Sequence, residues 1–356
     1  MNKKIIILLI LGIMALLLGG VMFYYEYSLG AVSDDETSVI IEIKEGTSAK
    51  EIINQLYEAN LIKNKYPVYF YYKMKGNLNL QAGNYMLNRT MDVENILKKI
   101  SSGDTINEVV QITFKEGKWV PKYVSLISEG FGYQESEIYD IISDVAYLKE
   151  LIDKYWFLTE DILNESIYYP LEGYLYPDTY IFSKEATIKE IIEKILDNTN
   201  AKLEPYKALL TSSDKYSIHE YMTMASIIEL EANKEEDRKK VSQVLYKRLD
   251  SNDTLGSDVT TYYGAKKSMS EELSWSELGE SNAYNTRVTD GSMNGKLPVG
   301  PITNPTVTSI DAALNKALTD YYYFIANVCT GEVFFTNTIE EHIAKGKELS
   351  SICELN

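Results

Sequence analysis

Two glutamates near the middle of the chain, Glu229 and Glu231, have the residue type and the position that acid catalysis needs. They stand at the end of an apolar stretch, and apolar surroundings raise the pKa of a carboxyl group. A raised pKa is what a general acid requires at neutral pH. The alternative is that both are solvated helix-end residues, as most glutamates are. This pattern alone does not decide between the two interpretations.

The elements that would position these acids are two helices within residues 217–249, joined by a short bend. Ser217 followed by Glu220 predicts a capping box at the start of the first helix. Glu229 and Glu231 flank the predicted apolar face on opposite sides, so the helical pattern does not choose between them. The apolar face consists of Tyr221, Met224, Ala225 and Ile228.

Four further segments have the composition of cleft walls. Residues 168–180 contain two prolines, one glycine and five tyrosines, which predicts a constrained aromatic loop ending in a short strand. Such a loop could stack on a ring-shaped ligand, or its tyrosines could pin it to the core. Residues 255–264, 283–287 and 296–305 are polar and rich in turn formers, typical of segments that line clefts but also of ordinary surface loops.

The composition restricts the class of ligand. The chain has 356 residues and a formal net charge of -17, which argues against a nucleic-acid partner because such proteins present a basic face. The 29 tyrosines suit sugar surfaces, although compositional drift would also explain them. Two histidines, and two cysteines outside any C-x-x-C motif, predict neither a zinc site nor a redox pair. The sequence leaves open whether Cys329 and Cys353 form a disulfide.

The N-terminus predicts a membrane anchor. Lys3 and Lys4 precede an uncharged, mostly apolar run at 5–23, roughly 19 residues, which is long enough to cross a bilayer. The positive-inside rule places the lysines in the cytoplasm and the chain after about residue 28 outside. A cleaved signal peptide is the alternative, but the apolar run is too long and no A-x-A site follows it.

The rest of the chain predicts an α+β fold with a small and a larger domain. A small α/β unit at 38–103 is expected to end near a polar boundary at 101–105, and residues 104–356 form the larger mixed domain. In the small unit we expect strands at 39–43 and 82–85 and helices that begin after Ser48, at 61–72 and after Asp92. In the larger domain we expect helices within 119–163, after Thr187 and from Ser309, a hairpin at 321–335 and a final helix opening at Thr338 with Glu341.

Five ordered motifs resemble a known family. The chain is similar to the endolytic murein transglycosylases of the YceG-like (MltG) family over nearly its whole length, and the unit at 38–103 looks like the LysM-like subdomain of that family. The motifs are Leu171–Tyr180 (LEGYLYPDTY), Met224–Glu231 (MASIIELE), Ala283–Thr286 (AYNT), Leu297–Ile302 (LPVGPI) with Asn304–Pro305, and Phe335–Thr338 (FTNT).

The resemblance implies a peptidoglycan lyase. Family members cleave the β-1,4 bond between N-acetylmuramic acid and N-acetylglucosamine within peptidoglycan strands and leave 1,6-anhydro ends. The catalytic glutamate is the second acid of the E-x-E pair, which implies Glu231 here. No metal or organic cofactor is implied, and peptidoglycan synthases are named as candidate partners by analogy alone. The predicted substrate-binding residues are Asp258, Tyr284, Asn285, Thr286, Glu229 and Tyr176.

One acid is enough for this chemistry. An ordinary glycosidase needs an acid together with a nucleophile or base. In a transglycosylase the muramyl 6-hydroxyl is the nucleophile, so a single glutamate can donate one proton and then accept another.

Two departures from the family pattern keep a second hypothesis open. The family has Gln and Pro where this chain has Gly256 and Val259, and residues 290–296 are extra before the Leu297 motif. The alternative function is a non-catalytic, membrane-anchored protein that binds glycan or serves as a scaffold of the cell-wall synthesis machinery.

Overall fold

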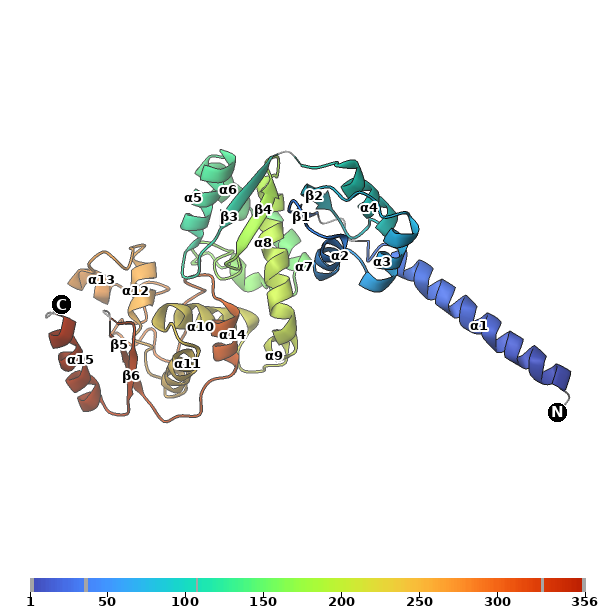
Figure 1. The fold of residues 1–356 in the computed structure, drawn as a ribbon. Coiled ribbons are helices and arrows are strands. Elements are labelled where there is room, and N and C mark those ends of the chain that lie inside the picture. Colours follow the sequence, from blue (N-terminus) through green and yellow to red (C-terminus); the bar gives the residue numbers. More distant parts are fainter. Residues whose placement is uncertain (1–2, 35–37, 107, 328–329, 354–356) are drawn as a thin grey trace. The chain divides into compact units, whose positions relative to one another are not determined.

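The structure is a computed structural model that describes residues 3–34, 38–106, 108–327 and 330–353 (Figure 1). It mixes helices and strands, which confirms the predicted α+β class. The chain divides into two compact units, Met1–Val110 with Ile181–Glu185, and Gln111–Tyr180 with Ala186–Asn356. The predicted domain boundaries at residues 28 and 103 stay predictions. Cys329 and the side chain of Cys353 lie outside the described residues.

The first unit begins with one long helix, α1 (Lys3–Leu29), which contains the predicted membrane-spanning run. Its part from Leu11 to Leu29 is long and apolar enough to cross a membrane. A single apolar helix near an N-terminus is consistent with the predicted anchor.

The remainder of the first unit packs three helices against a two-stranded antiparallel sheet. In the sheet, Ile41 of one strand lies opposite Tyr85 of the other, and both are buried in a common apolar core. The strands are β1 (Val39–Ile43) and β2 (Gly83–Leu87), and the helices are α2 (Ala49–Glu58), α3 (Lys65–Met74) and α4 (Val93–Ser102).

Local signals place most of these elements correctly. The capping box of Ser48 with Glu51 and the Asp92 N-cap are both present, as predicted. The predicted helix at 61–72 was wrong at its start, because Leu61 is buried in the core and the helix begins only after the N-cap Asn64, whose side chain accepts a hydrogen bond from the Tyr66 amide. The second strand also runs on to Leu87 instead of ending at residue 85.

Three helices of the second unit pack against one another. Helix α10 (Ile218–Glu231) contacts both α11 (Glu235–Asp250) and α14 (Val307–Leu314). The residues of β3 (Val109–Thr113) and β4 (Thr179–Ser183) are divided between the two units. The remaining elements of the second unit are α5 (Val120–Phe131), α6 (Glu135–Ile142), α7 (Val145–Lys154), η1 (Glu160–Leu163), α8 (Ile188–Leu203), η2 (Glu204–Tyr206), α9 (Lys207–Thr211), α12 (Asp258–Gly264), α13 (Trp275–Gly279), β5 (Tyr323–Ala326), β6 (Val333–Thr336) and α15 (Ile339–Cys353). Strand β3 pairs with β4, and β5 pairs with β6.

Helix α10 begins as predicted but is buried more completely. The capping box of Ser217 with Glu220 is present. Every side chain from Met222 to Glu229 is buried, so the prediction of a single apolar face was wrong. The physical reason is that neighbouring helices pack on more than one side, and the small and hydroxyl side chains Ala225 and Ser226 allow close approach.

Two further predictions in the second unit need correction. Residues 258–264, expected to be loop, form helix α12, although β-branched and aromatic residues with modest helix propensity dominate them. Val259, Thr260 and Thr261 are all buried, so tertiary packing and not local propensity makes this segment helical. Helix α14 begins at Val307 and not at Ser309.

The tyrosine loop at 168–178 is pinned to the core. The Tyr174 hydroxyl is 2.8 Å from Nδ1 of His219, and the His219 Nε2–H donates to the Val299 carbonyl at 3.0 Å. The amide of Gly173 donates to Oδ1 of Asn304 at 2.9 Å. Glu172 is buried and accepts hydrogen bonds from the Val120 amide at 3.0 Å and from Nδ2 of Asn304 at 3.1 Å. The loop therefore fits the interpretation in which its tyrosines anchor it.

We expect Gly173→Ala to destabilise the protein more than Gly132→Ala. Both glycines have a left-handed φ, +89° and +83°, which costs an alanine about 1–2 kcal/mol. A Cβ on Gly173 would lie 2.4 Å from Cβ of Pro301, whereas nothing lies within 4 Å of one on Gly132. Overpacking adds about 1–3 kcal/mol to the first variant. Denaturant unfolding followed by circular dichroism measures both, and equal losses would contradict the close approach.

Candidate active site

The two acids at the end of α10 have different environments. Glu229 has a side chain only 2% exposed, and its Oε1 lies 2.9 Å from Nη2 of Arg238 on α11. Its Oε2 accepts hydrogen bonds from the Thr306 amide at 2.9 Å and the Thr306 hydroxyl at 2.7 Å. Both oxygens of Glu229 are therefore used in joining α10 to α11 and to the start of α14.

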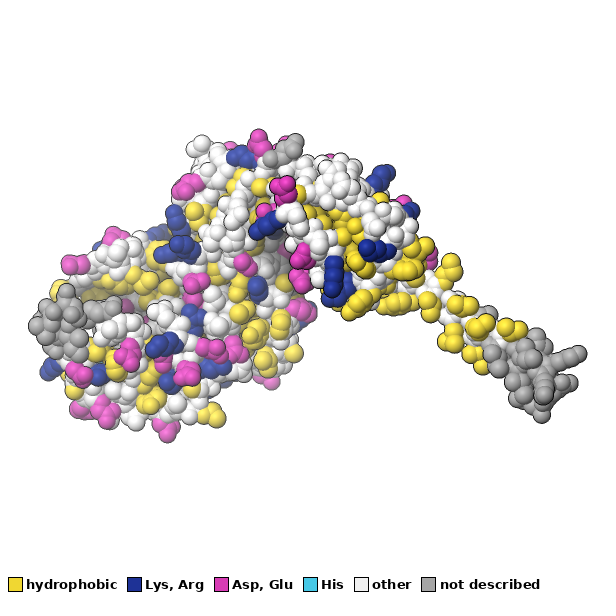
Figure 2. All heavy atoms as spheres, viewed as in Figure 1, with side chains coloured by type: hydrophobic (Ala, Val, Ile, Leu, Met, Phe, Trp, Pro, Cys, Tyr) yellow, Lys and Arg dark blue, Asp and Glu magenta, His cyan; other side chains and the backbone are white. Residues whose placement is uncertain are grey.

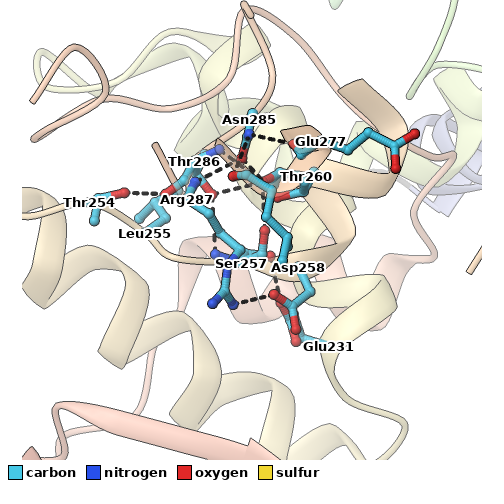
Figure 3. A network of polar contacts seen from close by, with 12 residues as sticks. Glu231, Thr254, Leu255, Ser257, Asp258, Thr260, Glu277, Asn285, Thr286 and Arg287 are labelled. Atoms are coloured by element: carbon cyan, nitrogen blue, oxygen red, sulfur yellow. Dashed lines mark hydrogen bonds and ion pairs between the residues drawn. The ribbon is translucent and has the colours of Figure 1, made fainter. Parts of the chain in front are cut away.

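Glu231 lies two residues after Glu229, is the last residue of α10 and points in another direction. Its Oε1 accepts a hydrogen bond from the hydroxyl of Ser257 at 2.5 Å (Figure 3). The pKa of Glu231 is raised to about 7, mainly by burial and also by the negative charge of Asp258. The Ser257 hydrogen bond and the positive charges of Arg248 and Arg287 lower the pKa but do not cancel the effect of burial.

A cavity of about 450 Å³ opens in front of Glu231. Asp258, the first residue of α12, shares this cavity and forms an ion pair with Arg287. The opposite wall comes from the C-terminal hairpin and helix, which are about 100 residues further along the chain. The lining residues are Glu231, Arg248, Gly256, Asp258, Arg287, Phe324, Ile325, Ala326, Asn327, His342, Gly346 and Leu349.

Arg248 is held in place by the backbone of two segments. Its Nη1 donates to the Leu255 carbonyl at 2.5 Å and its Nε to the Tyr322 carbonyl at 3.2 Å. The guanidinium also lies over the rings of Tyr322 and Tyr323. A fixed positive charge in the cavity suits a substrate that carries oxygen acceptors or carboxylates.

Three of the predicted substrate contacts lie behind the cavity wall. Tyr284, Asn285 and Thr286 are fully buried and are not among the lining residues. The Thr286 Oγ1 accepts a hydrogen bond from the Ser257 amide at 3.2 Å and lies 2.7 Å from Oγ1 of Thr260. Asn285 and Thr286 brace the segment that carries Ser257 and α12, as Figure 3 shows, whereas the Tyr284 ring packs against Tyr168 and Tyr263.

Of the other three predicted substrate contacts, one lines the cavity and two do not. Asp258 lies in the cavity with Glu231, as the sequence led us to expect. Glu229 is enclosed by Arg238 and Thr306, and Tyr176 is buried with its ring under the ammonium group of Lys202 at 5.2 Å. Neither Glu229 nor Tyr176 lines the cavity.

Sequence reasoning missed several residues of the site. Ser257 precedes the predicted Asp258, and Arg287 follows the predicted Tyr284–Thr286 segment, so their neighbours offered a weak signal. The hairpin residues Phe324–Asn327 and the α15 residue His342 carried no signal at all, because only the fold brings them to Glu231. Among the described residues no three His, Cys, Asp or Glu side chains come together in a way that could hold a metal ion.

Comparison with known proteins assigns the chain to a family. Residues 41–348 match the YceG-like family, which is most of the chain. The chain belongs to the YceG-like family. The predicted resemblance is thereby confirmed.

The relatives of this YceG-like chain include proteins with a named activity. An endolytic murein transglycosylase of Bacillus subtilis (strain 168) is 36% identical over 94% of this chain and 92% of its own length. One of Streptococcus pneumoniae serotype 2 is 30% identical over 96% of this chain, which spans 64% of that longer protein. The crystal structure of a yceG-like protein from Listeria monocytogenes has a TM-score of 0.61 and 34% identity, covering 86% of this chain and 98% of that one.

We expect Glu229→Ala to cost stability as well as activity. Removing Glu229 leaves the Arg238 guanidinium buried without its partner, which costs about 3–5 kcal/mol. Replacing both residues by methionine should lose much less, because no buried charge remains. Urea unfolding of the two variants tests this, with Glu235→Ala as the control, since the exposed Glu235–Lys239 pair contributes below about 1 kcal/mol. Unchanged stability of Glu229→Ala would mean that the ion pair does not hold the helices.

Proposed function

We propose that this protein is an endolytic lytic transglycosylase, a lyase that cleaves the β-1,4 bond between N-acetylmuramic acid and N-acetylglucosamine in peptidoglycan and leaves 1,6-anhydro ends. The relatives named endolytic murein transglycosylase support the reaction class. The observation that carries the assignment to this site is Glu231, a carboxyl group with a pKa of about 7 at the edge of a 450 Å³ cavity.

In the first step Glu231 acts as the general acid. With a pKa of about 7, a large share of Glu231 is protonated at neutral pH. The proton passes to the glycosidic oxygen, the bond from that oxygen to C1 of the muramyl sugar breaks, and the aglycone leaves as an alcohol. Ser257 holds Oε1 at 2.5 Å and so restricts the rotation of the carboxyl group before the proton is transferred.

In the second step the same group acts as the base. The Glu231 carboxylate removes the proton from the muramyl 6-hydroxyl while that oxygen forms its bond to C1 and closes the anhydro ring. Glu231 is thereby returned to its protonated form, so no water and no cofactor enters the balance. Among the described lining residues Asp258 is the other carboxylate, and its ion pair with Arg287 makes it a poor competitor as a nucleophile.

The remaining site residues receive indirect roles in this proposal. Asp258, Arg248 and Arg287 are placed to contact the sugar strand or its peptide substituents. Asn285, Thr286 and Glu229 are positioning residues, since they hold the segments that carry Ser257 and Glu231. Tyr284 packs behind them against the rings of Tyr168 and Tyr263. Tyr176 contributes to the pinned tyrosine loop.

The anchor places this chemistry at the outer side of the cell membrane. Helix α1 would cross the membrane once with residues 1–28, followed by a LysM-like subdomain at 38–103 and the catalytic domain at 104–356 outside. Peptidoglycan strands and the membrane are then the partners, with peptidoglycan synthases as further candidates by analogy.

The second candidate is a glycan-binding scaffold without activity. Gly256 and Val259 depart from the family pattern beside Asp258, and Gly256 lines the cavity with a left-handed φ of +61°. An inactive site gains nothing from an acid held near neutrality by burial, and this favours the enzyme.

Glu231→Gln should abolish the release of anhydro-muropeptides from purified glycan strands, because the amide can neither donate nor accept the proton. The fold should survive, since Gln is isosteric and still accepts the Ser257 hydrogen bond. Mass spectrometry of the digests separates the outcomes, with exposed Glu235→Gln as the active control. Full activity in Glu231→Gln refutes the assignment, intact bound strands from the wild type indicate a scaffold, and reducing ends indicate a hydrolase.

The pH dependence of the activity should depend on the charged residues around Glu231. The acid must be protonated, so activity should fall as the pH rises through about 7. Asp258 raises the pKa of Glu231, so Asp258→Asn should move this alkaline limb to lower pH, whereas Arg287→Gln should move it to higher pH. Initial rates of anhydro-end formation across the pH range measure the shift. A limb that stays in place in both variants would show that another group titrates.

A further inference from the structure

The exposed stripe of helix α3 is apolar and aromatic. Its outward positions repeat at i, i+3, i+4, i+7 and i+8, which is one continuous face of a helix. On this face Tyr66 is 76%, Phe70 57% and Met74 68% exposed. A soluble surface would carry charged residues at such positions, and a contiguous apolar patch indicates a partner. The stripe consists of Tyr66, Tyr69, Phe70, Lys73 and Met74.

The stripe of α3 is continuous with the end of α1. The Phe70 ring packs edge-on against Tyr25 of α1 at a centroid distance of 5.8 Å. The side-chain amide of Asn64 donates to the Tyr24 hydroxyl at 2.7 Å, and the Lys63 ammonium donates to the Tyr27 carbonyl at 3.2 Å. These contacts tie α3 to the last turns of the helix that is apolar enough to cross a membrane. Figure 2 shows hydrophobic side chains gathered over this junction.

The stripe carries one lysine, Lys73, and Lys63 and Lys65 precede it in the chain. Lys63, Lys65 and Lys73 have no carboxylate partner in the described part of the chain. Lys65 lies over the ring of Tyr57 and Lys73 over the ring of Tyr69, at 5.7 and 5.5 Å. Tyrosine rings with flanking lysines are the combination found where a protein meets the headgroup layer of a bilayer.

We propose that α3 lies flat in the headgroup layer on the outer side of the membrane that α1 crosses, with Tyr66, Phe70 and Met74 dipping toward the acyl chains and Lys65 and Lys73 binding anionic lipid phosphates. This inference rests on the proposed anchor. The occupant of the stripe is a lipid surface and not a second protein, because the stripe begins at the end of the proposed membrane-spanning helix and combines apolar side chains with lysines that have no carboxylate partner among the described residues. The first unit then has two points of attachment, which fix its orientation on the bilayer.

Depth measurement with spin labels tests the proposal in the full chain. The protein, with Cys329 and Cys353 replaced by serine, receives one cysteine at a time in place of Phe70, Met74, Lys98 or Leu18. Each labelled protein is reconstituted into vesicles that contain phosphatidylglycerol. Relaxation by oxygen, which concentrates in lipid, is compared with relaxation by a water-soluble nickel chelate. Phe70 and Met74 are already exposed, so the labels do not disturb the core.

We expect several-fold higher ratios of oxygen to nickel accessibility at Phe70 and Met74 than at Lys98, which is exposed on α4. If Leu18 gives a high ratio but Phe70 and Met74 give the same ratio as Lys98, this inference is overturned and the anchor is left intact. A low ratio at Leu18 would overturn the anchor and the inference with it. Low accessibility to both reagents at Phe70 would mean that protein and not lipid covers the stripe, which also overturns the proposal.

Discussion

The candidate site depends on one half-buried carboxyl group at the end of a buried helix. Burial raises the pKa of Glu231 to about 7, and the neighbouring arginines and Ser257 do not reverse that effect. The Ser257 hydroxyl at 2.5 Å restricts the carboxyl group. Ser257 is itself held through its amide by the buried Thr286. The proposed chemistry thus requires a rigid polar network behind the cavity wall as well as the acid in front of it.

A second carboxylate on the same helix shows how strongly position decides the role of a side chain. Glu229 is two residues away from Glu231, yet it is enclosed by Arg238 and Thr306 and reaches no cavity. A buried ion pair is weak support for stability by itself, but breaking one is costly. Glu229 therefore locks α10 to α11 and to the start of α14, and this packing sets the direction in which Glu231 leaves the helix.

The cavity is assembled from segments that are far apart in the chain. Glu231 ends α10, Asp258 begins α12, and the facing wall comes from the β5–β6 hairpin and from His342 and Leu349 on α15. Two acidic and two basic residues line it, with Asp258 paired to Arg287 and Arg248 fixed by two backbone carbonyls. This distribution suits a long polar substrate better than a small apolar one.

The sequence by itself determined the features that depend on residues a few positions apart. The capping boxes at Ser48 and Ser217, the apolar run in α1 and the C-terminal hairpin were all predicted, because each depends on local spacing. The resemblance to the family implied Glu231 as the acid and Asp258 as a sugar contact, and both roles stay predictions. Only the tertiary structure showed that Tyr284 and Thr286 lie behind the wall, that residues 258–264 are helical and that the hairpin faces Glu231. Burial and pKa depend on groups brought together from distant parts of the chain, and no local pattern contains that information.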